Sequence, residues 1–127
     1  MTDLAVLGAG SAGYAAALRA TQLGLDVTLI DPGELGGTCL HTGCIPTKAW
    51  LHAAEVRRTV VGADAFGIAG GAGDVDAGRV RAHADGVVAQ LHRGLSGLIS
   101  SRGIRHVAAK GTLVGGTTIE ADGERIE

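Results

Sequence analysis

The chain has 127 residues and a formal net charge of −2 at pH 7, and 46% of its residues are hydrophobic. That length and hydrophobic content suffice for one folded domain with a core. The near-neutral charge excludes a strongly basic surface of the kind that binds nucleic acid or an anionic membrane. Polar residues interrupt the N-terminal apolar stretch, and no basic segment precedes it, which argues against a membrane span and a secretory signal. We therefore expect a soluble, cytoplasmic protein.

The beginning of the chain predicts a strand, a helix and a second strand. Residues 3–8 form a short apolar run, and a helical pattern extends from Gly13 to Leu23, with Gly24 placed to end the helix. Residues 26–31, with the sequence DVTLID, are rich in β-branched and apolar side chains. The order strand, helix, strand predicts a βαβ unit with parallel strands.

A glycine motif, G-x-G-x-x-G, joins the first strand to the first helix and occupies Gly8–Gly13. In such a loop Gly8 permits a tight turn, Gly10 lets the backbone approach a pyrophosphate, and Gly13 lets the helix pack closely. Asp31 ends the second strand, where a carboxylate can accept hydrogen bonds from ribose hydroxyls. The pattern predicts a dinucleotide site, and the alternative is a glycine turn of another α/β protein. The acidic Asp31 argues against NADP, but the motif does not distinguish NAD from FAD.

Two further helices are expected in the middle of the chain. One should run from somewhere in the glycine-rich residues 34–48 to Val60, followed by a loop over 62–75. Asp76 is placed to cap the N-terminus of a long helix, which Gly103 ends. Three glycines inside this long helix suggest close packing against a neighbouring element: Gly86, Gly94 and Gly97.

The end of the chain predicts strands only. Residues 104–109 read as a strand, and 111–127 alternate in short runs around two hairpin signals, Gly115-Gly116 and Asp122-Gly123. The predicted fold class is α/β: a Rossmann-like domain over 1–127, with a parallel sheet, flanking helices and a small antiparallel β-meander at about 111–127.

The two cysteines, Cys39 and Cys44, lie in a segment rich in glycine at 36–48. Residues five apart in a regular helix are separated by about 7.5 Å along the axis. A disulfide requires Cα atoms roughly 4.4–6.8 Å apart, so a bridge needs a distorted first turn, which Gly43 and Pro46 would permit. A bridge of this kind is strained and reducible, and a thiol near a helix N-terminus has a lowered pKa. Both features predict a redox-active pair.

Three other interpretations of the cysteines agree less well with the sequence. A zinc site would need two further ligands, and the five histidines show no compact ligand spacing, so no metal is expected. Two inert buried thiols would not need the flanking glycines and proline. A thioredoxin-like site would have C-x-x-C, which the segment lacks.

The segment G-G-T-C-L-H-T-G-C-I-P-T-K at 36–48 resembles the active-site signature of the class I pyridine nucleotide-disulfide oxidoreductases. Its Leu-x-x-Gly-Cys-Ile-Pro-Thr-Lys form is most similar to the dihydrolipoamide (dihydrolipoyl) dehydrogenases of that family. The resemblance covers the whole chain and includes the loop Gly8–Gly13, the run 20–31, the tripeptide at 66–68 and the helix at Gly94 that leads to 110–112.

The resemblance implies FAD in the glycine loop, with Asp31 on its ribose and Gly111 near its adenine. Cys44 would face the flavin in a charge-transfer contact, and Cys39 would be the interchange thiol that exchanges with the substrate. His41 falls at a position that varies in the family, and we interpret it as local scaffolding. The residues expected to contact FAD are Gly8, Gly10, Ser11, Ala12, Gly13, Asp31, Gly37, Thr38, Lys48 and Gly111.

The implied activity is the oxidation of dihydrolipoamide, carried on lipoyl domains of 2-oxo acid dehydrogenase complexes, with NAD⁺ as co-substrate of a homodimeric enzyme. Enzymes of the family are longer, and their NAD-binding domain and dimerisation domain, which carries a catalytic His–Glu pair, have no counterpart in 1–127. An N-terminal portion, inactive by itself, is therefore expected. The alternatives are a related mycothione, glutathione or mercuric reductase, or a non-catalytic FAD-binding fragment.

Overall fold

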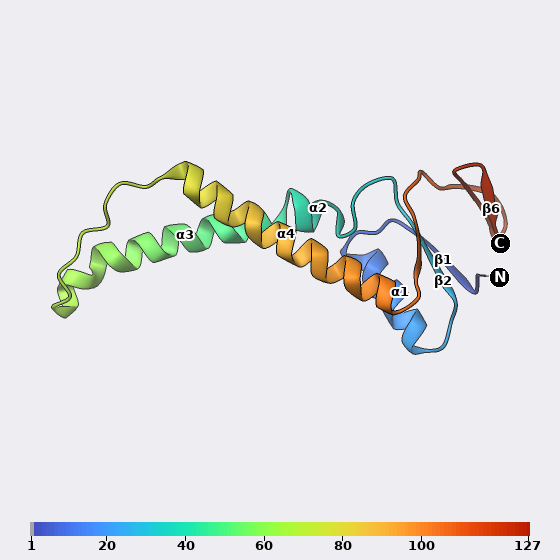
Figure 1. Ribbon diagram of the computed structural model, residues 1–127, viewed down its shortest axis with the longest axis horizontal. Helices are drawn as coiled ribbons and strands as arrows, with labels where there is room; N and C mark the ends of the chain where they lie inside the picture. The colour runs from blue at the N-terminus through green and yellow to red at the C-terminus, as the bar shows by residue number, and fades with distance from the viewer. Residues whose placement is uncertain (1) are drawn as a thin grey trace.

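A three-stranded parallel sheet organises one end of the molecule. The computed structural model describes residues 2–127 and pairs β1 (Leu4–Leu7) and β3 (Arg105–Val107) with a central strand, β2 (Val27–Ile30). Helix α1 (Ser11–Gln22) connects β1 to β2, and both termini lie at this end (Figure 1). The predicted βαβ unit is confirmed.

The central strand β2 is buried at every position because it is covered on both faces. Val27 and Leu29 belong to a core shared with Ala17 of α1 and Ile99 of helix α4 (Ala77–Ser101). The next residue, Ile30, points to the opposite face, as period-2 alternation requires, and joins a second core with residues of the C-terminal strands. The body therefore has three layers: helices, parallel sheet and meander.

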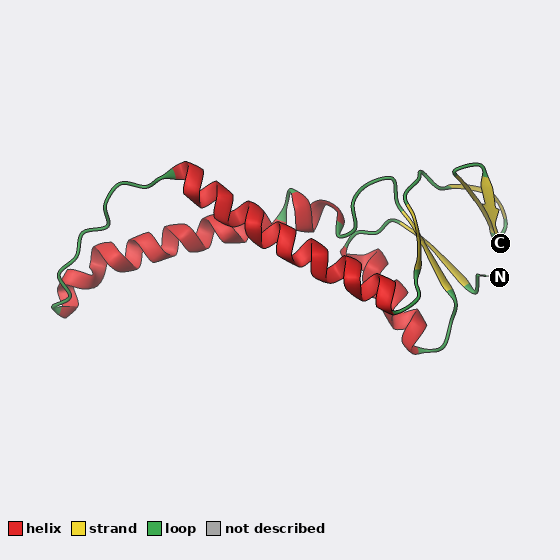
Figure 2. Ribbon diagram, viewed as in Figure 1, coloured by secondary structure: helices red, strands yellow, loops and turns green. Residues whose placement is uncertain are grey.

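The meander consists of three antiparallel strands near the C-terminus (Figure 2). Asp122 and Gly123 have φ values of 53° and 74°, so the turn between the last two strands has both central residues in the left-handed region. This is the turn that the sequence Asp-Gly favours between paired strands. The strands are β4 (Thr112–Gly115), β5 (Thr118–Ala121) and β6 (Glu124–Ile126).

The cysteine segment forms two helices: a short one that was not predicted, and the helix predicted to begin within 34–48 and to end at Val60, which extends to Gly62. Helix α2 (Gly37–His41) is a short first helix, and α3 (Cys44–Gly62) begins anew at the second cysteine. Between them Gly43 has φ −119° and ψ −107°, which is not helical, so the chain changes direction there. The predicted loop after α3 contains a short 3₁₀ turn, η1 (Ala63–Phe66).

Helix α4 (Ala77–Ser101) runs from the far end of the molecule back to the sheet (Figure 1). Asp76 caps it as predicted, because its carboxylate accepts a hydrogen bond of 3.0 Å from the amide of Arg79. Gly103, at φ 68°, ends it. The prediction that its glycines allow close packing against a neighbour is wrong. A Cβ built on Gly86, Gly94 or Gly97 would meet no atom within 4 Å.

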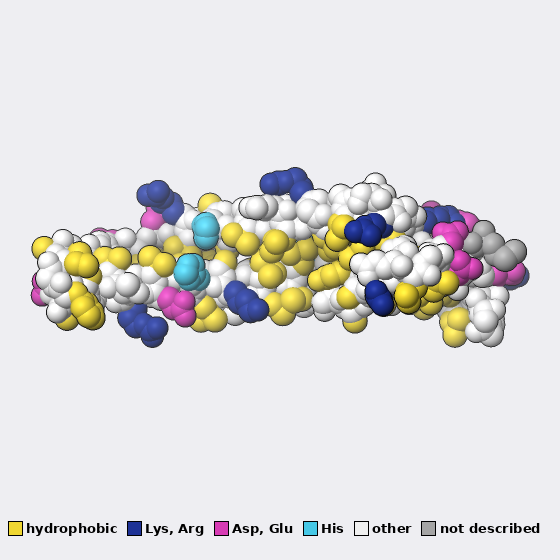
Figure 3. All heavy atoms as spheres, turned by 90° about the horizontal axis from the view of Figure 1, so that it is seen from below, with side chains coloured by type: hydrophobic (Ala, Val, Ile, Leu, Met, Phe, Trp, Pro, Cys, Tyr) yellow, Lys and Arg dark blue, Asp and Glu magenta, His cyan; other side chains and the backbone are white. Residues whose placement is uncertain are grey.

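The helices α3 and α4 pack against each other and project from the body as a long arm. Apolar side chains are visible along much of its length in Figure 3. Several of them are largely exposed, among them Leu51 (60%), Phe66 (85%) and Ile68 (63%). Within residues 2–127, no helix combines the length and the apolar character needed to cross a membrane.

Candidate functional site

The glycine loop between β1 and α1 is tightly folded. Gly8 has φ 99°, which a residue with a side chain rarely adopts, and its amide donates to the carbonyl of Ile30 at 2.8 Å. A Cβ on Gly13 would lie 1.7 Å from the carbonyl oxygen of Gly8. The first turn of α1 is therefore pressed against the loop, and both glycines are required by the backbone path itself.

The N-terminus of α1 carries no side-chain cap. Gly10 is the capping residue and supplies no side-chain acceptor, and no acidic residue lies in the first turn. Ser11 and Ala12 are exposed. The free amide groups of this turn and the positive end of the helix dipole form a site for an anion such as a pyrophosphate. Gly37 of α2 approaches closely, since a Cβ there would lie 2.9 Å from the Cα of Gly10.

Asp31 connects this loop to the turn after β2. One carboxylate oxygen accepts from the amide of Ala9 and the other from the amide of Gly33, both at 2.7 Å. The carboxylate is partly exposed and borders a polar hollow beside the glycine loop. The residues that line this hollow are Asp31, Gly33, Glu34, Gly37, Thr38, His41 and Thr42. The uncapped helix, the carboxylate and the hollow together fit a dinucleotide.

Gly111 and Lys48 lie apart from this hollow's lining. A Cβ on Gly111 would lie 2.3 Å from Cδ2 of Leu7 and 3.0 Å from Cγ2 of Ile30, so the backbone of residue 111 passes close to the ends of β1 and β2. Lys48 is exposed on α3, one helical turn after Cys44. The structure thus brings Gly8–Gly13, Asp31, Gly37 and Thr38 together, with Gly111 at the strand ends.

The cysteines face each other across the break between α2 and α3. Both are thiols, with Cys39 partly buried on α2 and Cys44 exposed as the first residue of α3. Gly43 makes this approach possible, because a Cβ there would lie 2.9 Å from the carbonyl oxygen of Thr38 and 3.5 Å from the Cα of Cys39. The helix break thus takes the place of the distorted first turn that the spacing predicts. The disulfide itself stays a prediction.

The pKa of the Cys39 thiol is raised above its ordinary value. A side-chain hydrogen bond with Cys44 raises the pKa of Cys39, and burial and the charge of Cys44 raise it further. A backbone hydrogen bond and the positive charge of Lys48 act in the opposite direction and are smaller. The hydrogen bond with Cys44 therefore favours the protonated form of the Cys39 thiol.

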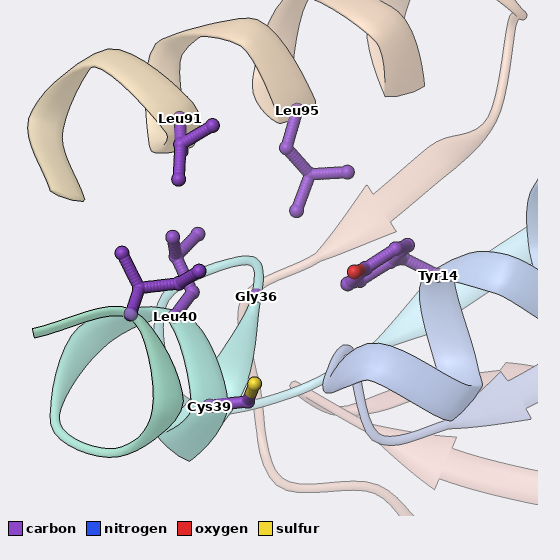
Figure 4. A pocket seen from close by; sticks show the side chains of 7 residues that line it. Tyr14, Gly36, Cys39, Leu40, Leu91 and Leu95 are labelled. Carbon is purple, nitrogen blue, oxygen red and sulfur yellow. The ribbon is translucent and has the colours of Figure 1, made fainter. Parts of the chain in front are cut away.

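Cys39 also borders an apolar hollow of about 270 Å³ between α1, α2 and α4 (Figure 4). Tyr14 closes one side of it, and Leu91 and Leu95 of α4 close another. Sequence reasoning missed this hollow, because α4 is distant in the chain. Tyr14 offered one signal, since it is one of few aromatic residues and lies in the first turn after the glycine loop. The remaining lining residues are Gly36, Leu40 and Ile45.

His41 holds α2 against the segment that precedes it, in agreement with the scaffolding role expected for it. Its Nε2 lies 2.9 Å from the carbonyl oxygen of Leu35, and its Nδ1 lies 3.2 Å from Oε2 of Glu34. The ring of His92, on α4, packs edge-on at a centroid distance of 5.0 Å. Within residues 2–127, no group of three or more His, Cys, Asp or Glu side chains is placed to share a metal ion.

The structure combines a parallel βαβ unit, a glycine loop followed by an uncapped helix, and two thiols on adjacent helices. This combination is typical of a redox fold that binds a nucleotide. The chain belongs to the pyridine nucleotide-disulphide oxidoreductase family, whose model matches residues 2–127. As an N-terminal portion of that fold, it is an α/β structure with a parallel sheet and flanking helices.

Curated relatives align with this chain over nearly all of the chain's length. Dihydrolipoyl dehydrogenases of Thermus scotoductus and Vibrio cholerae are 42% and 43% identical, over 96% of the chain. A dihydrolipoyl dehydrogenase of Bacillus subtilis is 42% identical over 95%. The chain spans only 26–27% of the length of these relatives.

A solved structure has the same fold at lower sequence identity. The copper(II) complex of the HOCl-induced flavoprotein disulfide reductase RclA from Escherichia coli aligns with a TM-score of 0.73 at 22% identity. The alignment covers 92% of this chain and 24% of that one.

Proposed function

We propose that residues 1–127 form the FAD- and dithiol-carrying part of a disulfide oxidoreductase that oxidises dihydrolipoamide with NAD⁺. The observation that carries the proposal is the position of Cys39, whose side chain borders an apolar hollow while it also contacts Cys44. Cys39 can therefore meet an apolar dithiol substrate while it stays in contact with Cys44, the more exposed of the two thiols. The names of the relatives at 42–43% identity favour the same substrate.

The proposed FAD site uses the residues that fit a dinucleotide. The amides at the start of α1 would bind the pyrophosphate, Asp31 would accept from the ribose, and Gly111 would lie near the adenine. When bound, FAD supplies the redox chemistry that links dithiol oxidation to NAD⁺. The remaining proposed contacts are Gly37, Thr38 and Lys48.

The proposed thiol chemistry is two successive exchange reactions at Cys39. A thiolate of the substrate attacks Sγ of Cys39 in the Cys39–Cys44 disulfide, a new S–S bond forms, and the thiolate of Cys44 leaves. The second thiolate of the substrate then attacks the substrate sulfur that is bonded to Cys39. The bond between that sulfur and Cys39 breaks, and the thiolate of Cys39 is released. The substrate has lost two electrons and two protons and is a disulfide, and the protein is a dithiol.

The apolar hollow suits a substrate whose dithiol is part of a hydrocarbon chain. Its walls are mainly the side chains of Tyr14, Leu91 and Leu95, and burying methylene groups against them is favourable by about 0.8 kcal/mol each. A lipoyl group has this character, whereas a glutathione-like substrate is charged. We therefore propose lipoyl domains of 2-oxo acid dehydrogenase complexes as partners of a homodimeric, cytoplasmic enzyme.

Flavin binding and thiol-dependent reduction test this function separately. The purified chain is mixed with FAD, and binding is followed by the quenching of flavin fluorescence; dihydrolipoamide is then added without oxygen and the visible flavin absorbance is recorded. We expect binding, followed by bleaching that Cys39→Ser and Cys44→Ser each abolish. A chain that binds FAD but shows no cysteine-dependent bleaching would instead support a non-catalytic FAD-binding fragment.

A comparison of dithiols tests the substrate. Dihydrolipoamide should reduce the Cys39–Cys44 disulfide about tenfold faster than dithiothreitol, a polar dithiol, at equal thiolate concentration, since only the former gains from the apolar hollow. Leu95→Asn should remove most of that preference. Equal rates for the two reagents would contradict lipoyl specificity and leave a reductase of another thiol.

A further inference from the structure

Two side chains bring polar atoms into the apolar hollow beside α2, those of Cys39 and Tyr14. The other side chains of its lining are leucines and an isoleucine, and Gly36 has no side chain to offer. The sulfur of Cys39 and the hydroxyl of Tyr14 point into the hollow from different walls (Figure 4). An anion that enters this space therefore leaves water for walls in which the Tyr14 hydroxyl is the one oxygen-bearing side chain.

The ring of Tyr14 is fixed in position while its hydroxyl is left free. The backbone amide of Tyr14 donates to the carbonyl of Gly10 at 3.0 Å, and the ring packs against the core that includes Ala17 and Leu29. Among the side-chain hydrogen bonds of residues 2–127, none involves this hydroxyl. A phenol hydroxyl both donates and accepts, so Tyr14 presents an unused donor to the hollow.

The hollow suits a short dithiol bonded to Cys39. Its volume of about 270 Å³ is below the roughly 300–1,000 Å³ of pockets that hold drug-sized ligands. A substrate sulfur that bonds to Cys39 places the rest of the molecule in this space, because Cys39 borders it. The second sulfur of a dithiol then lies inside the hollow, in which Tyr14 presents its donor.

We propose that Tyr14 is a catalytic residue that donates a hydrogen bond to the second sulfur of the dithiol while the first sulfur is bonded to Cys39. Its place in the reaction rests on the proposed function. The second sulfur enters as a thiolate after its proton has gone to solvent, and the phenol keeps its own proton. The thiolate attacks the sulfur bonded to Cys39, an S–S bond forms within the substrate, and Cys39 leaves as a thiolate. The substrate is oxidised by two electrons, which the protein disulfide has received.

The two exchange steps differ in where the charge lies. In the first step the charge passes to Cys44, which is exposed to water. In the second step the charge stays within the apolar hollow, where an anion without a hydrogen bond is disfavoured. A hydrogen bond to an ionised group is stronger than one between neutral groups, so its loss in Tyr14→Phe should slow the second step about tenfold or more.

Rapid quenching in acid measures both steps. The Cys39–Cys44 disulfide is mixed with propane-1,3-dithiol or propane-1-thiol, and mass spectrometry follows the disulfide, the mixed disulfide and the reduced protein. In Tyr14→Phe we expect the mixed disulfide with the dithiol to resolve about tenfold or more slowly. Formation of the mixed disulfide with either reagent should stay within about twofold of the parent, because the phenylalanine ring fills the same space.

The outcomes distinguish this role from a structural one. An unchanged second step, or equal slowing of both steps as a loss of packing would cause, overturns the proposal. If the parent forms no mixed disulfide with either reagent, the proposed function fails, and the catalytic role of Tyr14 fails with it.

A second experiment detects the contact without turnover. The chain has one tyrosine, so labelling with 3-fluorotyrosine gives a single ¹⁹F NMR signal. In Cys44→Ser, thiosulfonate reagents attach either 3-mercaptopropionate, whose carboxylate takes the place of the second sulfur, or propane-1-thiol to Cys39. We expect the two adducts to give different ¹⁹F shifts, whereas the same adducts on Cys44 in Cys39→Ser should not. Equal shifts for the two adducts on Cys39 would show that an anion there does not meet the hydroxyl, and would overturn the proposal whether or not the parent exchanges with dithiols.

Discussion

At the scale of single residues, Gly10 and Gly13 belong to one loop but have different surroundings. A Cβ on Gly13 would lie 1.7 Å from the carbonyl oxygen of Gly8, whereas one on Gly10 would meet no atom within 4 Å. Gly10 also has φ −69°, which alanine adopts freely. The glycine at position 13 is therefore required for folding, and the one at position 10 has no such structural requirement.

Alanine substitutions should separate these roles. Gly13→Ala should lower the free energy of unfolding by about 2 kcal/mol or more, because backbone must shift. Gly10→Ala should change it by less than about 0.5 kcal/mol but weaken FAD binding at least about tenfold, since the methyl group would enter the space of the pyrophosphate. Urea unfolding gives the first quantity and flavin fluorescence the second. Equal loss of stability in the two variants would contradict this division.

At the scale of elements, the sequence predicts the parts of the site that are local. The loop Gly8–Gly13 and the turn at Asp122 follow from short motifs whose backbone requirements are strict. The separation of α2 from α3 was missed because Gly43, as a glycine, permits both a helix and a break, and only its contact with Thr38 decides between them. The contact between His41 and His92 was missed because α4 packs there through tertiary structure.

Gly43→Ala tests whether the break between α2 and α3 positions the thiols. The added Cβ would lie 2.9 Å from the carbonyl oxygen of Thr38, so α2 must move, and Cys39 with it. In a glutathione redox buffer, we expect the equilibrium constant for the Cys39–Cys44 disulfide to fall about tenfold. Gly62→Ala is the control, because a Cβ at residue 62 meets nothing within 4 Å. An unchanged equilibrium in Gly43→Ala would show that the break is not what brings the thiols together.

A second test at this scale concerns the ion pair that joins the parallel sheet to the meander. Arg105 of β3 donates to both carboxylate oxygens of Glu124 of β6, and these hydrogen bonds lower the pKa of Glu124. Because its pKa is lower in the folded state, the pair stabilises the fold above the unfolded-state pKa of glutamate. That contribution is lost as pH falls through the folded-state pKa.

The melting temperature should show this dependence. Glu124→Gln should melt below the parent at neutral pH, and the two should converge in acid as pH falls through the lowered folded-state pKa of Glu124. Because both side chains are about half exposed, the difference should also shrink in about 1 M salt. Arg81→Gln removes a more exposed pair with Asp85 and should have little effect at any pH. A difference between Glu124→Gln and the parent that persists at low pH would point to packing instead.

At the scale of the whole molecule, the arm formed by α3 and α4 leaves an unusual amount of apolar surface in water. At its far end Val61 is 56% exposed, Phe66 85% and Ile68 63%, and Leu51 and Val56 of α3 are exposed as well. Neither the sheet nor the meander reaches this end (Figure 1). Exposed apolar patches of this kind promote association, and little of the fold's stability depends on their side chains.

The purified chain should therefore bind the dye ANS and sediment with increasing apparent mass as its concentration rises. Phe66→Gln combined with Ile68→Gln should reduce both effects about twofold or more, because each side chain is mostly in water and contributes to the surface rather than to the core. The free energy of unfolding should change by less than about 1 kcal/mol for the same reason. Ile99→Gln is the contrasting variant: its side chain is 2% exposed within the core of the body, so it should unfold the chain and increase dye binding. If the double variant instead loses stability as Ile99→Gln does, the end of the arm is part of the folded core and not an exposed surface.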